Sequence, residues 1–351
     1  MQSSTDRVHK LDPMSDIRWP ELLARHPQAS VFHSPEWLRA LKDTYGYTPI
    51  VFTTTGEGEL RNGIVLCEVR SWLTGNRLIS LPFSDHCQPL ADRDELSAIF
   101  HSLRDHRKET KCKYIELRPA LDGELVGQSG LNVTESFSLH TIDLRPQLEQ
   151  IYRRFHDSCV RRKIKRAERE NLTLESGNTS ELLGKFRHLQ LLTRRRHKLP
   201  PQPATWFDNL ARCLGEKLKI YVLSKDGIAA ASILTISYKN TLMYKYGCSD
   251  ARFHNLGGMP LLFWKAIQEG KSAGAEFFDL GRSSAEDPGL LAFKGHLGGV
   301  ACDLHYFRDT PASKPKEAPE QPRIHWTRDA LARLPEPLLV GAGNLLYRHF
   351  A

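Results

Sequence analysis

The sequence lacks paired cysteines, long apolar runs and an apolar leader. Its seven cysteines are scattered, with no CxxC pair and no Cys/His cluster at zinc spacing, so we expect reduced thiols and no metal. No apolar run is long enough to cross a bilayer, and the polar N-terminus is unlike a signal peptide. These absences argue against a disulfide-rich secreted protein and a membrane-spanning one. We expect a cytoplasmic protein, at most peripheral to the inner face of the membrane.

What is present fits a globular chain with anionic partners. The 351 residues are 40% hydrophobic and 26% charged, enough to bury cores, and the length favours two domains. The 49 Lys and Arg against 41 Asp and Glu give a net charge of +8. This excess favours phosphorylated substrates, nucleic acid or an acidic membrane surface, without choosing among them.

The apolar patterns predict an α/β fold with mixed sheets. In the first half we expect strands at 49–54, 62–70, 77–82, 113–118 and 136–142, and helices from Pro35 and over 94–106. In the second half we expect strands at 218–224, 230–238, 242–248 and 276–282, and helices at 182–195, 205–214 and 260–273. A hairpin, strand, helix and strand recur in this order, which favours two tandem copies of one unit.

The predicted boundaries follow from that repeat. We expect an N-terminal domain over 1–145 and a C-terminal domain over 146–309. Residues 310–351 are predicted to be a Pro-rich linker followed by an amphipathic helix. That helix either packs against the second domain or makes peripheral contact with a membrane.

One stretch, 241–299, carries an arrangement that suits an anion. A strand, a turn containing Asn255, Gly257 and Gly258, and a helix from Pro260 would present free backbone N–H groups at the helix N-terminus. A purely structural turn is the alternative. The end of the stretch, 291–299, is predicted to be a Gly-rich loop.

A basic segment lies earlier in the chain. Residues 148–169 predict a single long helix with an apolar stripe on one side and many arginines and lysines on the other. Arg162 and Lys163 belong to this basic face. Such a run is either a solvated surface or, since few acidic residues balance it, a stripe for phosphate groups.

Several motifs together resemble the FemABX-like and BioF2-like branch of the GNAT acyltransferase superfamily. They lie at 32–37, 81–86, 161–167, 171–174, 193–197, 244–249, 278–281 and 293–299, so they extend over most of the chain. The resemblance implies two tandem GNAT-like domains and transfer of an acyl or aminoacyl group to an amine. In FemABX relatives the donor is aminoacyl-tRNA and the acceptor is a peptidoglycan precursor.

The resemblance also implies roles for individual residues. Phe293 and Lys294 match the Phe–Lys pair of the family, in which the lysine assists transfer near the donor ester. Arg196 matches an arginine that contacts acceptor phosphate together with a tyrosine of a strand, here Tyr244 or Tyr246.

The sequence leaves the donor open. Residues 254–259 do not match the pyrophosphate loop of ordinary GNAT enzymes, which counts against acetyl-CoA. No long helical arm of the kind that some FemABX members use for tRNA is evident either. We therefore expect a donor that is either aminoacyl-tRNA or acyl-CoA, and no tightly bound cofactor.

Candidates for acid–base chemistry are few. Asp279 sits at the end of a buried-looking strand and is either a base or the cap of a turn. Asp85 and His86 form a second candidate pair, for which a structural histidine is the alternative. Positioning alone supplies much of the rate in such transfers, so a dedicated base is not required.

The leading hypothesis is an N-acyltransferase acting on a cell-wall or cell-surface glycan precursor that is phosphorylated or lipid-linked. The alternative enzyme is an acyl-CoA-dependent N-acetyltransferase of an amino sugar or amino acid. From another class, a nucleic-acid-binding module would need stacking aromatics among the arginines, and residues 161–169 contain none.

Overall fold

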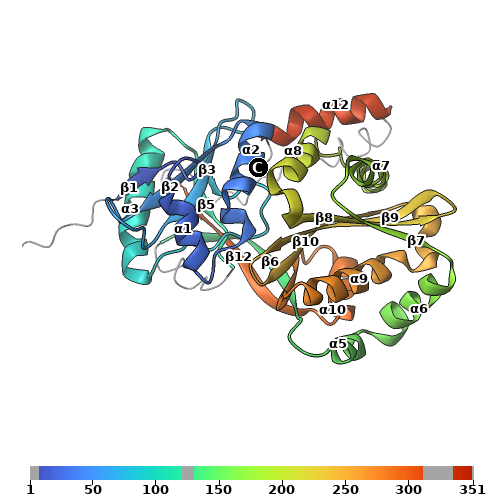
Figure 1. Cartoon of the computed structure of the whole chain (residues 1–351). Helices are drawn as coiled ribbons and strands as arrows, with labels where there is room; N and C mark the ends of the chain where they lie inside the picture. Colours follow the sequence, from blue (N-terminus) through green and yellow to red (C-terminus); the bar gives the residue numbers. More distant parts are fainter. Residues whose placement is uncertain (1–7, 121–129, 311–334, 350–351) are drawn as a thin grey trace, which may run out of the picture. The chain divides into compact units, whose positions relative to one another are not determined.

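The structure is a computed structural model that describes the chain except for residues 1–7, 121–129, 311–334 and 350–351 (Figure 1). The predicted Pro-rich linker lies almost entirely outside the described residues. The described chain is a mixed α/β protein, which confirms the predicted fold class.

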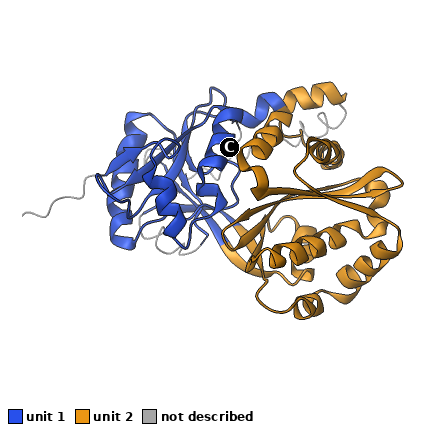
Figure 2. Cartoon of the chain, in the orientation of Figure 1, with its two compact units in different colours: residues 1–136, 304–323, 344–351 blue, residues 137–303, 324–343 orange. Residues whose placement is uncertain are grey.

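The chain divides into two compact units (Figure 2). Unit 1 comprises Met1–Ser136, Leu304–Arg323 and Asn344–Ala351, and unit 2 comprises Phe137–Asp303 and Ile324–Gly343. The strands β6 (Asn132–Asp143) and β12 (Val300–Asp309) each contribute residues to both units. The predicted domain limits of 1–145, 146–309 and 310–351 stay a prediction.

Unit 1 has a mixed sheet in the order β1-β2-β3-β4-β5-β12. Its first five strands are His9–Leu11, Thr48–Thr53, Ile64–Val69, Arg77–Ser80 and Ile115–Leu117. The strands β4 and β5 pair in parallel, and the connection between them contains α3 (Arg93–Glu109). The predicted apolar side of α3 is buried in the core of this unit through Leu96, Ile99, Phe100 and Leu103.

Two further helices, α1 (Arg18–Arg25) and α2 (Pro35–Tyr45), belong to unit 1. The start of α2 follows from its sequence, because the Ser34 hydroxyl accepts the Trp37 N–H and Pro35 occupies the first turn. Gly46, with φ +72°, ends the helix.

Unit 2 has strands in the order β6-β11-β10-β9-β8-β7. These are, after β6, Phe277–Ser283, Thr241–Ser249, Ile228–Tyr238, Leu218–Lys225 and Thr173–Gly177. The helices α5 (Leu148–Arg154), α6 (Arg162–Arg169), α9 (Gly258–Ser272) and α10 (Pro288–His296) lie on one side of the sheet (Figure 1). On the other side lie α7 (Ser180–Arg196) and α8 (Ala204–Leu214). The sheet is therefore covered on both faces.

The parallel pair β10 and β11 positions the site described below. The two strands pair only from Thr241 to Met243, and β10 then changes register against β9 between Tyr244 and Tyr246. Beyond Met243 the described residues of β10 and β11 are not paired with each other. The crossover from β10 to β11 contains α9, whose N-terminus therefore lies near the end of β10.

Two local predictions are wrong. The single helix expected over 148–169 is interrupted after Arg154: Phe155 is extended, and a π-helical turn, η2 (Asp157–Arg161), precedes α6. The segment 291–299, predicted to be a Gly-rich loop, is helical as far as His296, because Asp287 caps α10 by accepting the Leu290 N–H and Pro288 begins the helix.

The last described α-helix, α12, spans Glu336–Leu346. Among the described residues, no helix is both long enough and apolar enough to cross a membrane.

Candidate functional site

A cavity of about 370 Å³ lies in unit 2 at the N-terminus of α9. It takes residues from α6, α7, β9, β10, η4 (Ala251–Leu256), α9 and α10. Its lining includes residues that the sequence singled out for binding or catalysis: Lys163, Arg196, Tyr244, Gly257, Gly258 and Phe293. The fold thus brings six predicted site residues from five elements to one cavity.

The N-terminus of α9 forms one wall. Gly257, with φ +80°, precedes the helix, and no side chain caps it. A Cβ at Gly257 would overlap the carbonyl group of Lys163, so this position needs glycine for both its conformation and its closeness to α6. The first N–H groups of α9 therefore face a cavity without competition from a capping side chain, as an anion site requires.

Two cations line the same cavity. Lys163 is exposed on α6. Arg196 ends α7, and its Nη1 donates to the Ser249 carbonyl at 3.0 Å and contacts His254 Nε2 at 3.3 Å. The arrangement combines two positive side chains with the positive end of the α9 dipole.

His254 is held as a neutral acceptor beside Arg196. Its Nε2 lies 2.9 Å from the Ser249 hydroxyl, which can donate to it as Arg196 does. Burial, followed by the charges of Arg196 and Lys163, lowers the pKa of His254. The ring therefore adds no positive charge at neutral pH and keeps the arginine in place.

One wall of the cavity is aromatic. Tyr244 packs on Phe263 with ring centroids 4.7 Å apart, and Phe293 meets Phe263 edge-on at 5.4 Å. The Tyr244 hydroxyl lies so close to Gly247 that a Cβ there would overlap it. This wall can hold the less polar part of a ligand whose phosphate lies at α9.

Lys294 and Asp279 lie outside the cavity lining and meet at a bulge in β11. Lys294 is 2% exposed, and its Nζ donates to the carbonyls of Gly281 at 2.7 Å and Arg282 at 3.0 Å. The Gly281 N–H donates to Asp279 Oδ1 at 2.7 Å. Asp279 therefore caps a turn, which is the alternative to a role as a base. The two hydrogen bonds of Lys294 hold α10 against the same turn.

Five other predicted residues lie away from the cavity. Tyr246 accepts hydrogen bonds from Gln202 and Trp206 behind β10, and Arg162 forms an ion pair with Asp157 at 3.0 Å. Asp85 and His86 belong to unit 1, where the Asp85 carbonyl accepts the Tyr306 hydroxyl and His86 meets Phe32 edge-on. Asn255 belongs to η4 and is not part of the lining.

The sequence interpretation missed two groups of residues. Thr193 and Ser249 join α7 to β10 by reciprocal hydrogen bonds at the cavity edge, and both lie within the motifs that carry the family resemblance. His156, Cys159 and His296 come together elsewhere in unit 2. Only the spacing of His156 and Cys159 was visible beforehand, because His296 lies far along the chain.

Residues 154–294, which include the whole cavity lining, match the family model described as acetyltransferase (GNAT) domain. This part of the chain is therefore a GNAT acyltransferase domain, as the resemblance implied. No curated protein sequence matches the chain.

Solved structures share the fold over most of the chain. FemX has a TM-score of 0.69 at 14% identity, covering 85% of this chain and 96% of its own. A tandem GNAT protein from the clavulanic acid biosynthesis pathway has a TM-score of 0.56 at 11% identity, covering 89% and 100%. The C-terminal domain of a putative lysylphosphatidylglycerol synthetase from Agrobacterium fabrum has 0.52 at 14%, covering 84% and 92%. These similarities confirm the tandem GNAT fold.

Proposed function

We propose that the chain is an N-acyltransferase that moves an acyl or aminoacyl group from a phosphate-bearing donor to an amine of a cell-wall or cell-surface glycan precursor. One observation carries this proposal: Lys163, Arg196 and the uncapped N-terminus of α9 line a single cavity in the GNAT domain. Aminoacyl-tRNA and acyl-CoA both carry phosphates, so the cavity suits either donor.

The charges divide the cavity into a phosphate end and an acyl end. A donor phosphate at the N–H groups of Gly258 and Met259 would lie within reach of the Lys163 ammonium, because Gly257 packs against the backbone of that lysine. The acyl group would then lie along the wall formed by Tyr244 and Phe293. Arg196, which lines the same cavity, is left for a phosphate of the acceptor.

The chemistry asks for a neutral amine, a polarised carbonyl and stabilisation of the oxyanion. Phe293 lines the cavity and would hold the acyl group in place. Lys294, one residue further on α10, contributes by fixing that helix to β11 through its two carbonyl contacts. Holding the two reactants side by side supplies much of the rate in such transfers.

The proposal that the acceptor is a glycan precursor rests on the resemblance to FemABX proteins. If the acceptor is lipid-linked, the enzyme works at the inner face of the membrane. Leu338 and Leu345 of α12 are each 58% exposed and would supply peripheral contact there.

Calorimetric titration of the full chain tests the donor first. The titrants are acetyl-CoA, a charged tRNA pool and the same pool after deacylation. The variant is Lys163→Gln, and Lys165→Gln, also exposed on α6 but outside the cavity, is the matched control. Binding of charged tRNA or acetyl-CoA that weakens only in Lys163→Gln supports the donor site at α9.

The acceptor is tested second, by mass spectrometry of lipid-linked precursor incubated with the donor that binds. A product heavier by one acyl or aminoacyl group supports the whole proposal. Equal binding of charged and deacylated tRNA without any product would instead support a nucleic-acid-binding module. Acyl transfer only to free amino sugars or amino acids would support the CoA-dependent alternative.

A further inference from the structure

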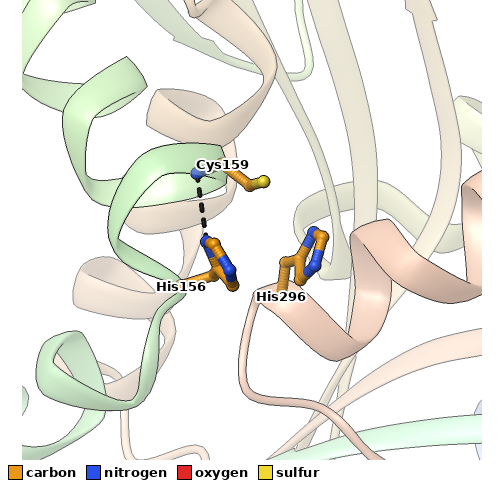
Figure 3. A group of neighbouring side chains, drawn as sticks. All are labelled: His156, Cys159 and His296. Atoms are coloured by element: carbon orange, nitrogen blue, oxygen red, sulfur yellow. Dashed lines mark hydrogen bonds between the residues drawn. The ribbon is translucent and has the colours of Figure 1, made fainter.

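Three metal-ligating side chains meet in unit 2, apart from the cavity. One ligand atom from each of His156, Cys159 and His296 can be chosen so that all three lie within 4.8 Å of one another. Figure 3 shows the two imidazoles and the thiol around a common space. We propose that this cluster is a zinc site, in place of the metal-free protein that the sequence predicted.

The ligand set selects the kind of metal. Two imidazoles and a thiolate are nitrogen and sulfur ligands of the type that Zn²⁺ takes in tetrahedral sites, whereas Mg²⁺ and Ca²⁺ require oxygen. Three protein ligands leave a fourth position for water. His156 is exposed at the rim, so solvent can reach that position.

The backbone already holds the two halves of the site together. The His156 N–H donates to the His296 carbonyl at 2.8 Å, which joins the start of η2 to the end of α10. A Cβ at Gly298 would lie 3.2 Å from the Cβ of Arg154, a second close approach of the same two segments. Metal binding therefore needs side-chain movement rather than a rearrangement of the chain.

The required movement is small. With Zn–N of about 2.0–2.1 Å and Zn–S of about 2.3 Å, tetrahedral geometry places neighbouring ligand atoms roughly 3.3–3.6 Å apart. The ligand atoms must thus close by about 1 Å or a little more. Metal binding has one structural cost. The Cys159 N–H donates to His156 Nδ1 at 3.3 Å, and a metal bound to the same imidazole would change the role of that nitrogen.

Nearby positive charge does not block the site. Arg161 and Arg162 both form ion pairs with Asp157, at 3.2 and 3.0 Å. A bound Zn²⁺ would release the thiol proton of Cys159, so the thiolate offsets one of its two charges. The metal would tie η2 to α10, the helix that contributes Phe293 to the cavity.

The test uses the metal-free full chain without a polyhistidine tag. Co²⁺ is titrated as a spectroscopic substitute, and Zn²⁺ affinity is measured by competition with a chromophoric chelator. We expect one equivalent of Co²⁺ to bind, with a thiolate-to-cobalt charge-transfer band that Zn²⁺ abolishes and Mg²⁺ does not. These readouts are independent of acyl transfer, so the proposed function can fail without affecting them.

Variants assign the ligands. Cys159→Ser and His296→Asn should each weaken Zn²⁺ binding by more than the roughly 10–100-fold that loss of an outer-sphere partner costs. Cys302→Ser and His188→Asn alter exposed residues of the same unit outside the cluster and should bind as the wild type does. Absence of binding to the wild-type chain at micromolar metal, or binding unchanged in Cys159→Ser, would overturn the proposal.

Discussion

The ammonium of Lys294 donates a 2.7 Å hydrogen bond to the carbonyl of Gly281, inside the bulge that interrupts the pairing of β11 with β6. The lysine is buried on α10, and Gly281 adopts φ +71°. The bond connects the helix that bears Phe293 to the strand that follows α9. One side chain therefore fixes how α10 borders the donor cavity.

Replacing Lys294 by methionine is expected to destabilise the protein. Methionine keeps much of the length but leaves the carbonyls of Gly281 and Arg282 without this buried donor, which costs on the order of 1–3 kcal/mol. Lys165→Met, on the exposed face of α6, should stay within about 0.5 kcal/mol of the wild type. Denaturant unfolding measures both, and equal stabilities would contradict the structural role given to Lys294.

Neutralising Lys163 is expected to weaken donor binding without unfolding the protein. An exposed charge facing a phosphate contributes about 0.2–1 kcal/mol, so Lys163→Gln should raise the donor Kd by up to about fivefold. The effect should shrink as salt rises, since the Debye length falls to about 3 Å at 1 M. Lys165→Gln removes a charge from the same helix outside the cavity and should bind the donor normally. An equal loss of donor affinity in both variants would indicate general attraction between the basic helix and an anion instead of a contact in the cavity.

The sequence predicted those elements that local pattern determines. The apolar residues of α3 and the cap formed by Ser34 and Pro35 depend on neighbours a few positions away. The N-terminus of α9 was found in the same way, from the glycines before Pro260.

The break after Arg154 could not be found from local pattern. The apolar stripe of the sequence continues past Arg154 to Ile164, which is buried even though a π-helical turn precedes its helix. What stops the helix is an extended Phe155 and the bond from the His156 N–H to the His296 carbonyl, a tertiary contact. The burial of Lys294 also depends on a tertiary contact, because the carbonyls that accept its hydrogen bonds belong to β11.

The helix α10 could have been found. Asp287 followed by Pro288 is a typical N-cap and first-turn pair. The glycines at 295, 298 and 299 suggested a loop instead, although only Gly298 among them has positive φ, +75°. In the cavity, Lys163, Arg196 and Gly257 were selected separately by charge, resemblance and turn pattern, and their proximity required the fold.

Substituting Gly257 by alanine should disturb the junction of α6 and α9. The position has φ +80°, and its Cβ would overlap the carbonyl group of Lys163. Gly274, with φ +90° and nothing within 4 Å of a Cβ, is a matched control for the conformational cost alone. We expect Gly274→Ala to lose about 1 kcal/mol and Gly257→Ala to lose more, together with donor affinity. Similar losses in both variants would show that the approach of Lys163 is not what requires glycine.

Acid should destabilise unit 1 through His33. Its ring is buried: Nδ1 accepts the Ser30 N–H at 3.0 Å, and Nε2 donates to the Gln88 carbonyl at 2.8 Å. Burial is the main reason that the pKa of His33 is lowered from 6.5 to about 4. The folded state therefore resists a proton that the unfolded chain accepts.

The sign and the pH window follow from that depressed pKa. Above about pH 6.5 the ring is neutral in both states, and nothing is lost. Between about 6.5 and 4 only the unfolded chain binds the proton, so stability falls by about 1.4 kcal/mol per pH unit, roughly 3 kcal/mol in all. His33→Gln, which can still donate to the Gln88 carbonyl, should flatten this decline, whereas exposed His188→Gln should not. Denaturant unfolding from pH 7 to pH 4 measures the slopes; parallel curves for wild type and His33→Gln would mean that this histidine takes up its proton in the folded state as readily as in the unfolded one.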